Sequence, residues 1–137
     1  MRRLKQVVPE HCRPYIVTDA GFRGPWFRQV ADLDWDFVGR VRNRIKCTPV
    51  NKDTWRYTTT MYKEATTRVR HLGQWLLSHK RPYPVRLYLA KMPSRGAGRP
   101  KKLHTKTKTP RRSRRAYNEP WLLATSLDHH RGMAKQV

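Results

Sequence analysis

A strand–helix–strand pattern near the N-terminus is the feature that most constrains the fold. Residues 15–18 (Tyr-Ile-Val-Thr) form a bulky, partly β-branched run that is typical of a buried strand. Gly21 breaks this run, and Pro25 suits the first turn of a helix that we expect to extend to about Leu33. A second strand is predicted over 35–42. Two strands joined through a helix are expected to be parallel, with a right-handed connection.

The rest of the chain differs from this unit in its residue pattern and composition. Residues 1–8 resemble the last turns of a helix, so 1–44 form one partial α/β core in this reading. Residues 45–92 are rich in β-forming residues and predict an antiparallel insertion. Its strands are expected at 55–60, 69–77 and 85–91, with His79–Pro82 as a connection.

The segment 93–118 carries many basic residues, and Leu103 is its only large aliphatic residue before Arg115. It is too poor in apolar residues to order itself, so we expect a flexible arm. Residues 119–137 are expected to return to the core as a strand over 119–127, followed by the start of a helix after Asp128.

Charge narrows the class of partner. The chain of 137 residues contains 31 Lys and Arg against 9 Asp and Glu, a formal net charge of +22. Such an excess indicates a polyanionic partner, most often nucleic acid. An acidic membrane surface is the rival, but no apolar run approaches the roughly 20 residues that a membrane helix requires, and no apolar signal core follows the basic N-terminus. We expect a cytosolic protein with no membrane partner, and two isolated cysteines, Cys12 and Cys47, make no zinc framework.

Four residues could carry chemistry or recognition. Asp19 follows the first strand, where it could hold a divalent cation; capping of the next turn is the commoner role for such a residue. Arg40 and Arg42 share one face of the second strand, and could bind phosphate or form a solvated basic face. Trp121 could stack on a base or anchor its strand in the core.

Taken together, these segments resemble DDE transposases of bacterial insertion sequences. The branch is the one that includes the enzymes of the tetracycline- and kanamycin-resistance transposons. The resemblance lies in Val17-Thr18-Asp19-Ala20-Gly21-Phe22, Pro25-Trp26-Phe27, Asp36-Phe37-Val38-Gly39-Arg40-Val41-Arg42 and Pro120-Trp121-Leu122-Leu123-Ala124-Thr125.

The resemblance implies an RNase H-like catalytic core interrupted by the β-rich insertion. In that family three carboxylates hold Mg²⁺ ions that promote attack on DNA phosphodiesters. Asp19 matches the second carboxylate, so the resemblance favours the metal role for it over the capping role. Arg40 matches a DNA-contacting residue, and Trp121 matches a tryptophan that stacks on a base flipped out of the hairpin at the transposon end. The further basic residues expected to bind DNA are Lys101, Lys102, Arg111, Arg112, Arg114 and Arg115.

The chain also departs from the family pattern. The strand with the first catalytic Asp would precede residue 1, and no Tyr has Arg three and Glu seven residues later, as the last catalytic helix requires. We therefore expect an internal transposase fragment, inactive alone and a weak Mg²⁺ binder, whose full-length relatives self-associate through the missing regions. The alternative is a non-enzymatic, ribosome- or nucleoid-associated nucleic-acid-binding protein.

Overall fold

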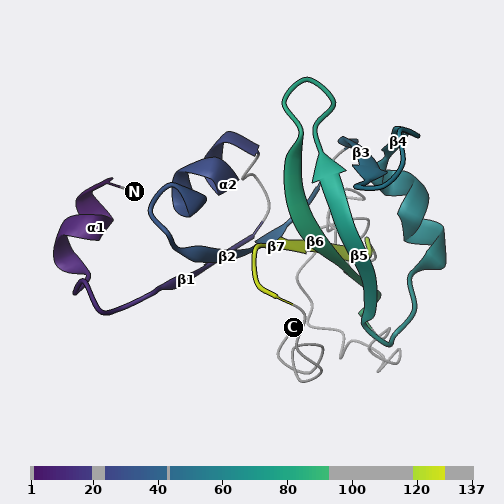
Figure 1. Ribbon diagram of the computed structural model, residues 1–137. Helices are drawn as coiled ribbons and strands as arrows, with labels where there is room; N and C mark the ends of the chain where they lie inside the picture. Colours follow the sequence, from purple (N-terminus) through teal and green to yellow (C-terminus); the bar gives the residue numbers. More distant parts are fainter. Residues whose placement is uncertain (1, 20–23, 43, 93–118, 129–137) are drawn as a thin grey trace, which may run out of the picture.

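A mixed sheet of seven strands organises the molecule, which we describe from a computed structural model (Figure 1). The structure describes residues 2–19, 24–42, 44–92 and 119–128. In chain order the elements are α1 (Arg2–Val7), β1 (Tyr15–Thr18), α2 (Gly24–Ala31), β2 (Asp36–Arg40), β3 (Lys46–Pro49), β4 (Arg56–Tyr57), the 3-10 helix η1 (Thr58–Glu64), β5 (Arg70–Leu77), β6 (Tyr83–Ala90) and β7 (Trp121–Thr125). The mixed α/β class expected from the sequence is confirmed.

The strands lie in the order β1-β2-β7-β6-β5-β3-β4. The β1–β2 pair is parallel, as the strand–helix–strand pattern predicts. The other pairs are antiparallel, including the long β5–β6 hairpin expected from the middle of the sequence. Because β7 pairs with both β2 and β6, the strands of the first and middle segments belong to one continuous sheet.

Sequence reasoning was wrong over part of the middle section. It predicted no strand at 46–49, where β3 lies, and it expected extended chain through 60, where η1 begins at Thr58. The buried Thr58 hydroxyl accepts a hydrogen bond from the Ile45 backbone N–H at 3.3 Å, and the turn of η1 buries Met61 in the core. A tertiary contact therefore overrides the local preference for strand.

One face of the sheet carries the main core. Phe37 of β2 and Val41, which directly follows β2, belong to this core together with Leu87 and Leu122, and all four are buried. The Phe27 ring of α2 stacks on the Phe37 ring with centroids 4.5 Å apart. Burial of this apolar face is the main stabilising contribution.

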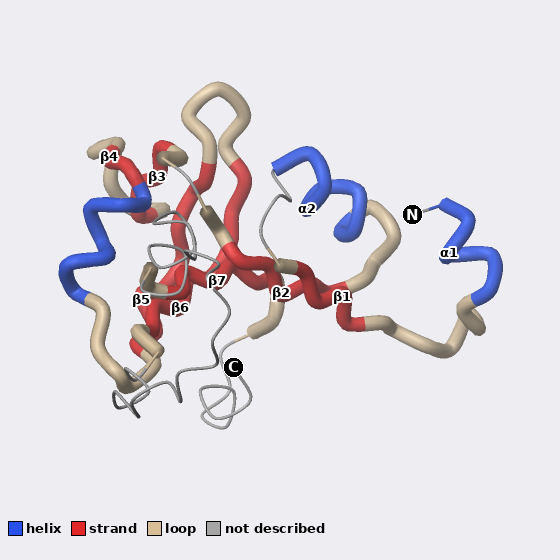
Figure 2. Tube along the Cα trace, turned by 180° about the vertical axis from the view of Figure 1, so that it is seen from behind, coloured by secondary structure: helices blue, strands red, loops and turns tan. Residues whose placement is uncertain are grey.

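The expectation that β1 is a buried strand was wrong. Tyr15 and Val17 are 64% and 75% exposed, whereas Ile16, which points to the other face, packs against the core. The cause is position: β1 is the end strand of the sheet, so among the described residues it has β2 as its one strand partner. Figures 1 and 2 show α1 at this end of the molecule, apart from α2.

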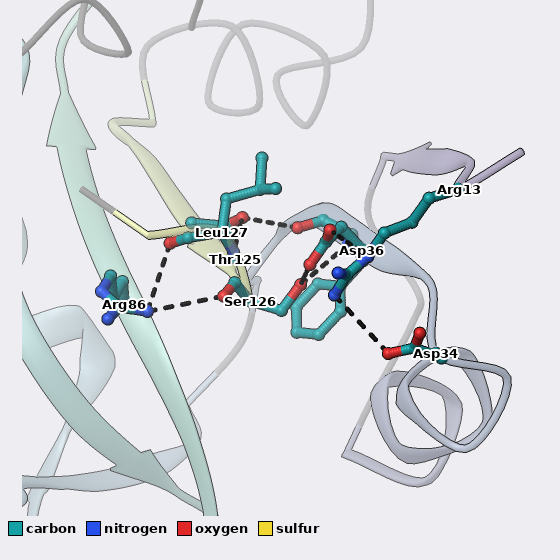
Figure 3. Close-up of polar contacts among 8 residues, drawn as sticks. Arg13, Asp34, Asp36, Arg86, Thr125, Ser126 and Leu127 are labelled. Carbon is teal, nitrogen blue, oxygen red and sulfur yellow. Dashed lines mark hydrogen bonds and ion pairs between the residues drawn. The ribbon is translucent and has the colours of Figure 1, made fainter. Parts of the chain in front are cut away.

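A polar network joins the start of β2 to the end of β7 (Figure 3). The buried Asp36 carboxylate pairs with the Arg13 guanidinium at 3.0 Å and accepts a hydrogen bond from the Ser126 hydroxyl at 2.8 Å. Arg86 donates to the backbone carbonyls of Ser126 and Leu127 at 3.4 and 3.3 Å. The network fixes the end of β7 against β2 and β6. It lies at the opposite end of the strands from Asp19, since Asp36 begins β2 and Asp19 follows the end of β1.

Gly39 provides a test of the packing between α2 and the sheet. A Cβ at this position would lie 2.7 Å from Cε1 of the buried Phe27 ring and 3.1 Å from the Thr18 hydroxyl oxygen. We expect Gly39→Ala to lower the free energy of unfolding by about 1–3 kcal/mol, because the overpacked ring must shift. Chemical denaturation measures the change.

Gly24→Ala is the matched control. Its added Cβ would meet its nearest atom, on Arg28, at 3.8 Å, and the residue begins a helix. We expect a change within about 0.5 kcal/mol. Equal stabilities of the two variants would contradict the proposed close approach.

Candidate nucleic-acid interface

Strand pairing brings the predicted site residues together at one edge of the sheet. Asp19 directly follows β1, and Arg40 ends β2. The parallel register, in which Thr18 pairs with Gly39, places these two strand ends side by side. The antiparallel pairing of β2 with β7 then brings Trp121, the first residue of β7, to the same edge.

Arg40 lies at the centre of this cluster and is only 6% exposed. Its Nη1 is 3.9 Å from a carboxylate oxygen of Asp19, and its Nη2 donates a hydrogen bond of 3.4 Å to the Glu119 backbone carbonyl. Its guanidinium carbon lies 4.7 Å from the centroid of the Trp121 ring, a cation–π contact. Its Nε is buried without a hydrogen-bond partner in the part of the chain that the structure describes.

Arg40 is buried beside a second guanidinium and two carboxylates. Burial is the main cause that lowers the pKa of Arg40, and the neighbouring Arg42 lowers it further, while Asp19 and Glu119 act in the opposite direction. An arginine keeps its charge despite such a shift. A charge held in a partly dehydrated place attracts an anion more strongly than the same charge in bulk water.

Arg42 and Trp121 are each partly accessible. The Nε of Arg42 is 4.0 Å from a carboxylate oxygen of Glu119, and the side chain is 31% exposed. Trp121 is 37% exposed, so it is not the core anchor that the alternative reading considered. An indole that is both exposed and backed by a guanidinium is a suitable platform for a stacked base.

Two members of the cluster were not identified from the sequence. Tyr62 comes from η1, an element that sequence reasoning did not predict, and it packs against the core. Burial, and then the nearby Glu119 carboxylate, raise the pKa of Tyr62 to about 12. Glu119 carried one sequence signal that we did not use: it is the first acidic residue after Glu64.

The six basic residues predicted to bind DNA between 101 and 115 lie outside the described residues. The same holds for the helix expected after Asp128.

The described residues do not contain a complete set of protein ligands for a metal ion. They contain no group of three or more His, Cys, Asp or Glu side chains that could hold a metal ion. Asp19 supplies one carboxylate, which is 80% exposed and lies 3.9 Å from the Arg40 guanidinium. Mg²⁺ in proteins is usually bound by one or two carboxylates together with substrate phosphates. Asp19 can therefore supply one carboxylate of such a site.

Comparisons with known proteins add no assignment: no protein-family profile, curated protein or solved structure matches this chain. Within the described residues, no helix is both long and apolar enough to cross a bilayer.

Arg40 allows a test of whether the cluster serves binding or stability. Its buried Nε lacks a partner, and its ion pair with the exposed Asp19 adds little stability. We expect Arg40→Met to leave the free energy of unfolding within about 1 kcal/mol of the native value, or to raise it. Thermal and urea denaturation provide the measurement.

Arg28→Met serves as the comparison. The Arg28 guanidinium donates hydrogen bonds to the backbone carbonyls of Arg81 and Pro82 at 2.7 and 3.2 Å, so its loss should cost about 0.5–1.5 kcal/mol. A loss above about 2 kcal/mol for Arg40→Met would show that Arg40 is a structural residue.

Proposed function

We propose that this chain is a DNA-binding part of a cut-and-paste transposase with a partial RNase H-like core. The observation that carries the proposal is the meeting of Asp19, Arg40 and Trp121 at one sheet edge. These three residues are the ones that the resemblance to DDE transposases assigns to the metal site, the DNA contact and the flipped base. They come from three separate strands or strand ends, so their meeting is a property of the fold.

The arrangement of strands supports the same proposal. Asp19 stands at the carboxyl end of β1, and β1 connects through α2 to the parallel β2, as an RNase H-like core requires. The exposed Tyr15 and Val17 leave one face of β1 open, and among the described residues the far edge of β1 has no strand partner. A further parallel strand that carries a second catalytic carboxylate would fit this edge.

In this proposal the chain contributes binding and positioning. Arg40 and Arg42 hold the DNA backbone, and Trp121 stacks on an unpaired base at a hairpin end. Asp19 would contribute one carboxylate to a magnesium site in a full-length transposase, together with carboxylates that the described residues lack. The partner is the DNA of the transposon ends, the protein would self-associate in its full-length form, and its place would be the bacterial cytoplasm at the nucleoid.

A general nucleic-acid-binding protein is the second candidate, favoured by the net charge of +22. Both candidates predict a steep dependence of affinity on salt, so salt alone does not separate them. The structure of the DNA that the chain prefers separates the two candidates, because stacking of a flipped base requires an unpaired end.

DNA preference is therefore the first test. We expect the chain to bind a DNA hairpin at least several-fold more tightly than a duplex of equal length or an RNA hairpin, as measured by fluorescence anisotropy at fixed salt. Trp121→Ala should remove about 10-fold of the hairpin affinity, since stacking on an aromatic side chain contributes roughly 1–3 kcal/mol per base. Its duplex affinity should not change.

Trp55→Ala is the control for this test. Trp55 is partly exposed but lies in the β3–β4 connection, where its ring contacts His79. Hairpin affinity should be unaffected by this change. Equal affinity for hairpin, duplex and RNA would contradict the transposase proposal in favour of the general binder.

The second test is cleavage. One carboxylate cannot position two metal ions, so we expect no strand nicking when the purified chain is incubated with hairpin or supercoiled DNA and Mg²⁺ or Mn²⁺. Gel electrophoresis of end-labelled DNA reads the outcome. Nicking by the native chain that is absent in Asp19→Ala would overturn the expectation.

A further inference from the structure

The Glu119 carboxylate lies in a group of hydrogen-bond donors. It stands two residues before Trp121, with the Arg42 guanidinium on one side and the Tyr62 hydroxyl close by. The Nη2 of Arg40 donates a hydrogen bond to the Glu119 backbone carbonyl, whereas the buried Nε of Arg40 has no partner among the described residues. The donors come from two parts of the chain, the end of β2 with the residues just after it and η1.

The contacts in this group are longer than those of a filled anion site. The Arg42–Glu119 distance is 4.0 Å, whereas charge-assisted hydrogen bonds are typically about 2.7–2.9 Å long. The Nε atoms of Arg40 and Arg42 are both buried without a hydrogen bond among the described residues, while the Tyr62 hydroxyl interacts with the Glu119 side chain. Buried donors are nearly always satisfied in native proteins, so two unsatisfied guanidinium nitrogens in one place indicate a ligand.

The donors suit a phosphate group better than a carboxylate. Two guanidinium groups can each contact a phosphate oxygen, and the Tyr62 hydroxyl, like that of any tyrosine at neutral pH, is a neutral donor. A phosphate offers more oxygens than the two of a carboxylate, spread around a tetrahedral centre. The Glu119 side chain is 30% exposed, so it has a route to solvent if another anion takes its place.

We propose that the Glu119 carboxylate occupies the binding site of one DNA phosphate, between Arg42 and Tyr62, and that a backbone phosphate displaces it when DNA binds. We call this site the phosphate seat. The inference rests on the proposed function, since it takes DNA as the partner. The adjacent Trp121 would stack on the base while the seat holds a phosphate of the same strand. Glu119 thereby acts as an internal competitor. It lowers the affinity for DNA that cannot both stack a base on Trp121 and place a phosphate in the seat.

Glu119→Gln tests the seat, with Glu64→Gln as the matched control. Glu64 pairs with Arg70 at 3.5 Å, and each substitution adds one unit of positive charge. The long-range attraction between protein and DNA therefore changes equally in the two variants. Tighter binding that is seen only in Glu119→Gln would report local competition for the phosphate. We expect its affinity for the DNA hairpin at fixed salt to exceed that of Glu64→Gln by at least 5-fold. Affinities within two-fold of each other would overturn the proposal.

Two further variants separate occupation of the seat from simple repulsion. Glu119→Asp keeps the charge but shortens the reach, so the seat predicts a gain in affinity and repulsion alone predicts none. Tyr62→Phe, introduced into Glu119→Gln, should lose at least 3-fold of the hairpin affinity because the phosphate loses a donor. A Tyr62→Phe change without effect on affinity would count against the seat, provided that the thermal transition shows the variant to be folded.

The outcomes distinguish this inference from the proposed function. Equal affinity for hairpin and duplex, with Glu119→Gln tightening both, would support the phosphate seat and defeat the transposase proposal. A clear hairpin preference with Glu119→Gln equal to Glu64→Gln would support the transposase proposal and defeat the seat.

Discussion

The parallel pairing of β1 with β2, held beneath α2, is the constraint on which the candidate site depends. It is possible because Gly39 leaves room for the Phe27 ring, which stacks on Phe37 and closes the helix onto the sheet. The pairing sets the register that brings Asp19 beside Arg40. The insertion of β7 between β2 and β6 then adds Trp121 and Glu119 to the same edge.

The charge distribution explains why this edge is suited to an anion. A net charge of +22 would attract any polyanion over the whole surface, so charge alone gives no selectivity. Arg40 differs from the surface residues because it is buried, faces an indole and lacks a partner for its Nε. Burial of such a charge costs some stability, and a local cost of this kind is a usual sign of a functional residue.

Much of the fold could be predicted from local pattern, and the site only in part. The bulky run of β1, the alternation in β6 and the strong apolar run of β7 each identify a strand from neighbouring residues alone. The four residues of β3 are too few to show a period, and η1 forms because Thr58 and Met61 meet distant partners. Tyr62 and Glu119 entered the site for the same reason: their positions depend on tertiary contacts that no local pattern contains.

Photocrosslinking tests whether the end of a DNA strand binds at the edge formed by Asp19, Arg40 and Trp121. A hairpin with 5-iodouracil in its unpaired loop, irradiated with the chain and mapped by mass spectrometry, reports which of the five tryptophans contacts the base. We expect the crosslink to fall on Trp121. Crosslinks confined to other aromatic residues, such as Trp55 or Tyr57 at the far end of the sheet, would contradict it.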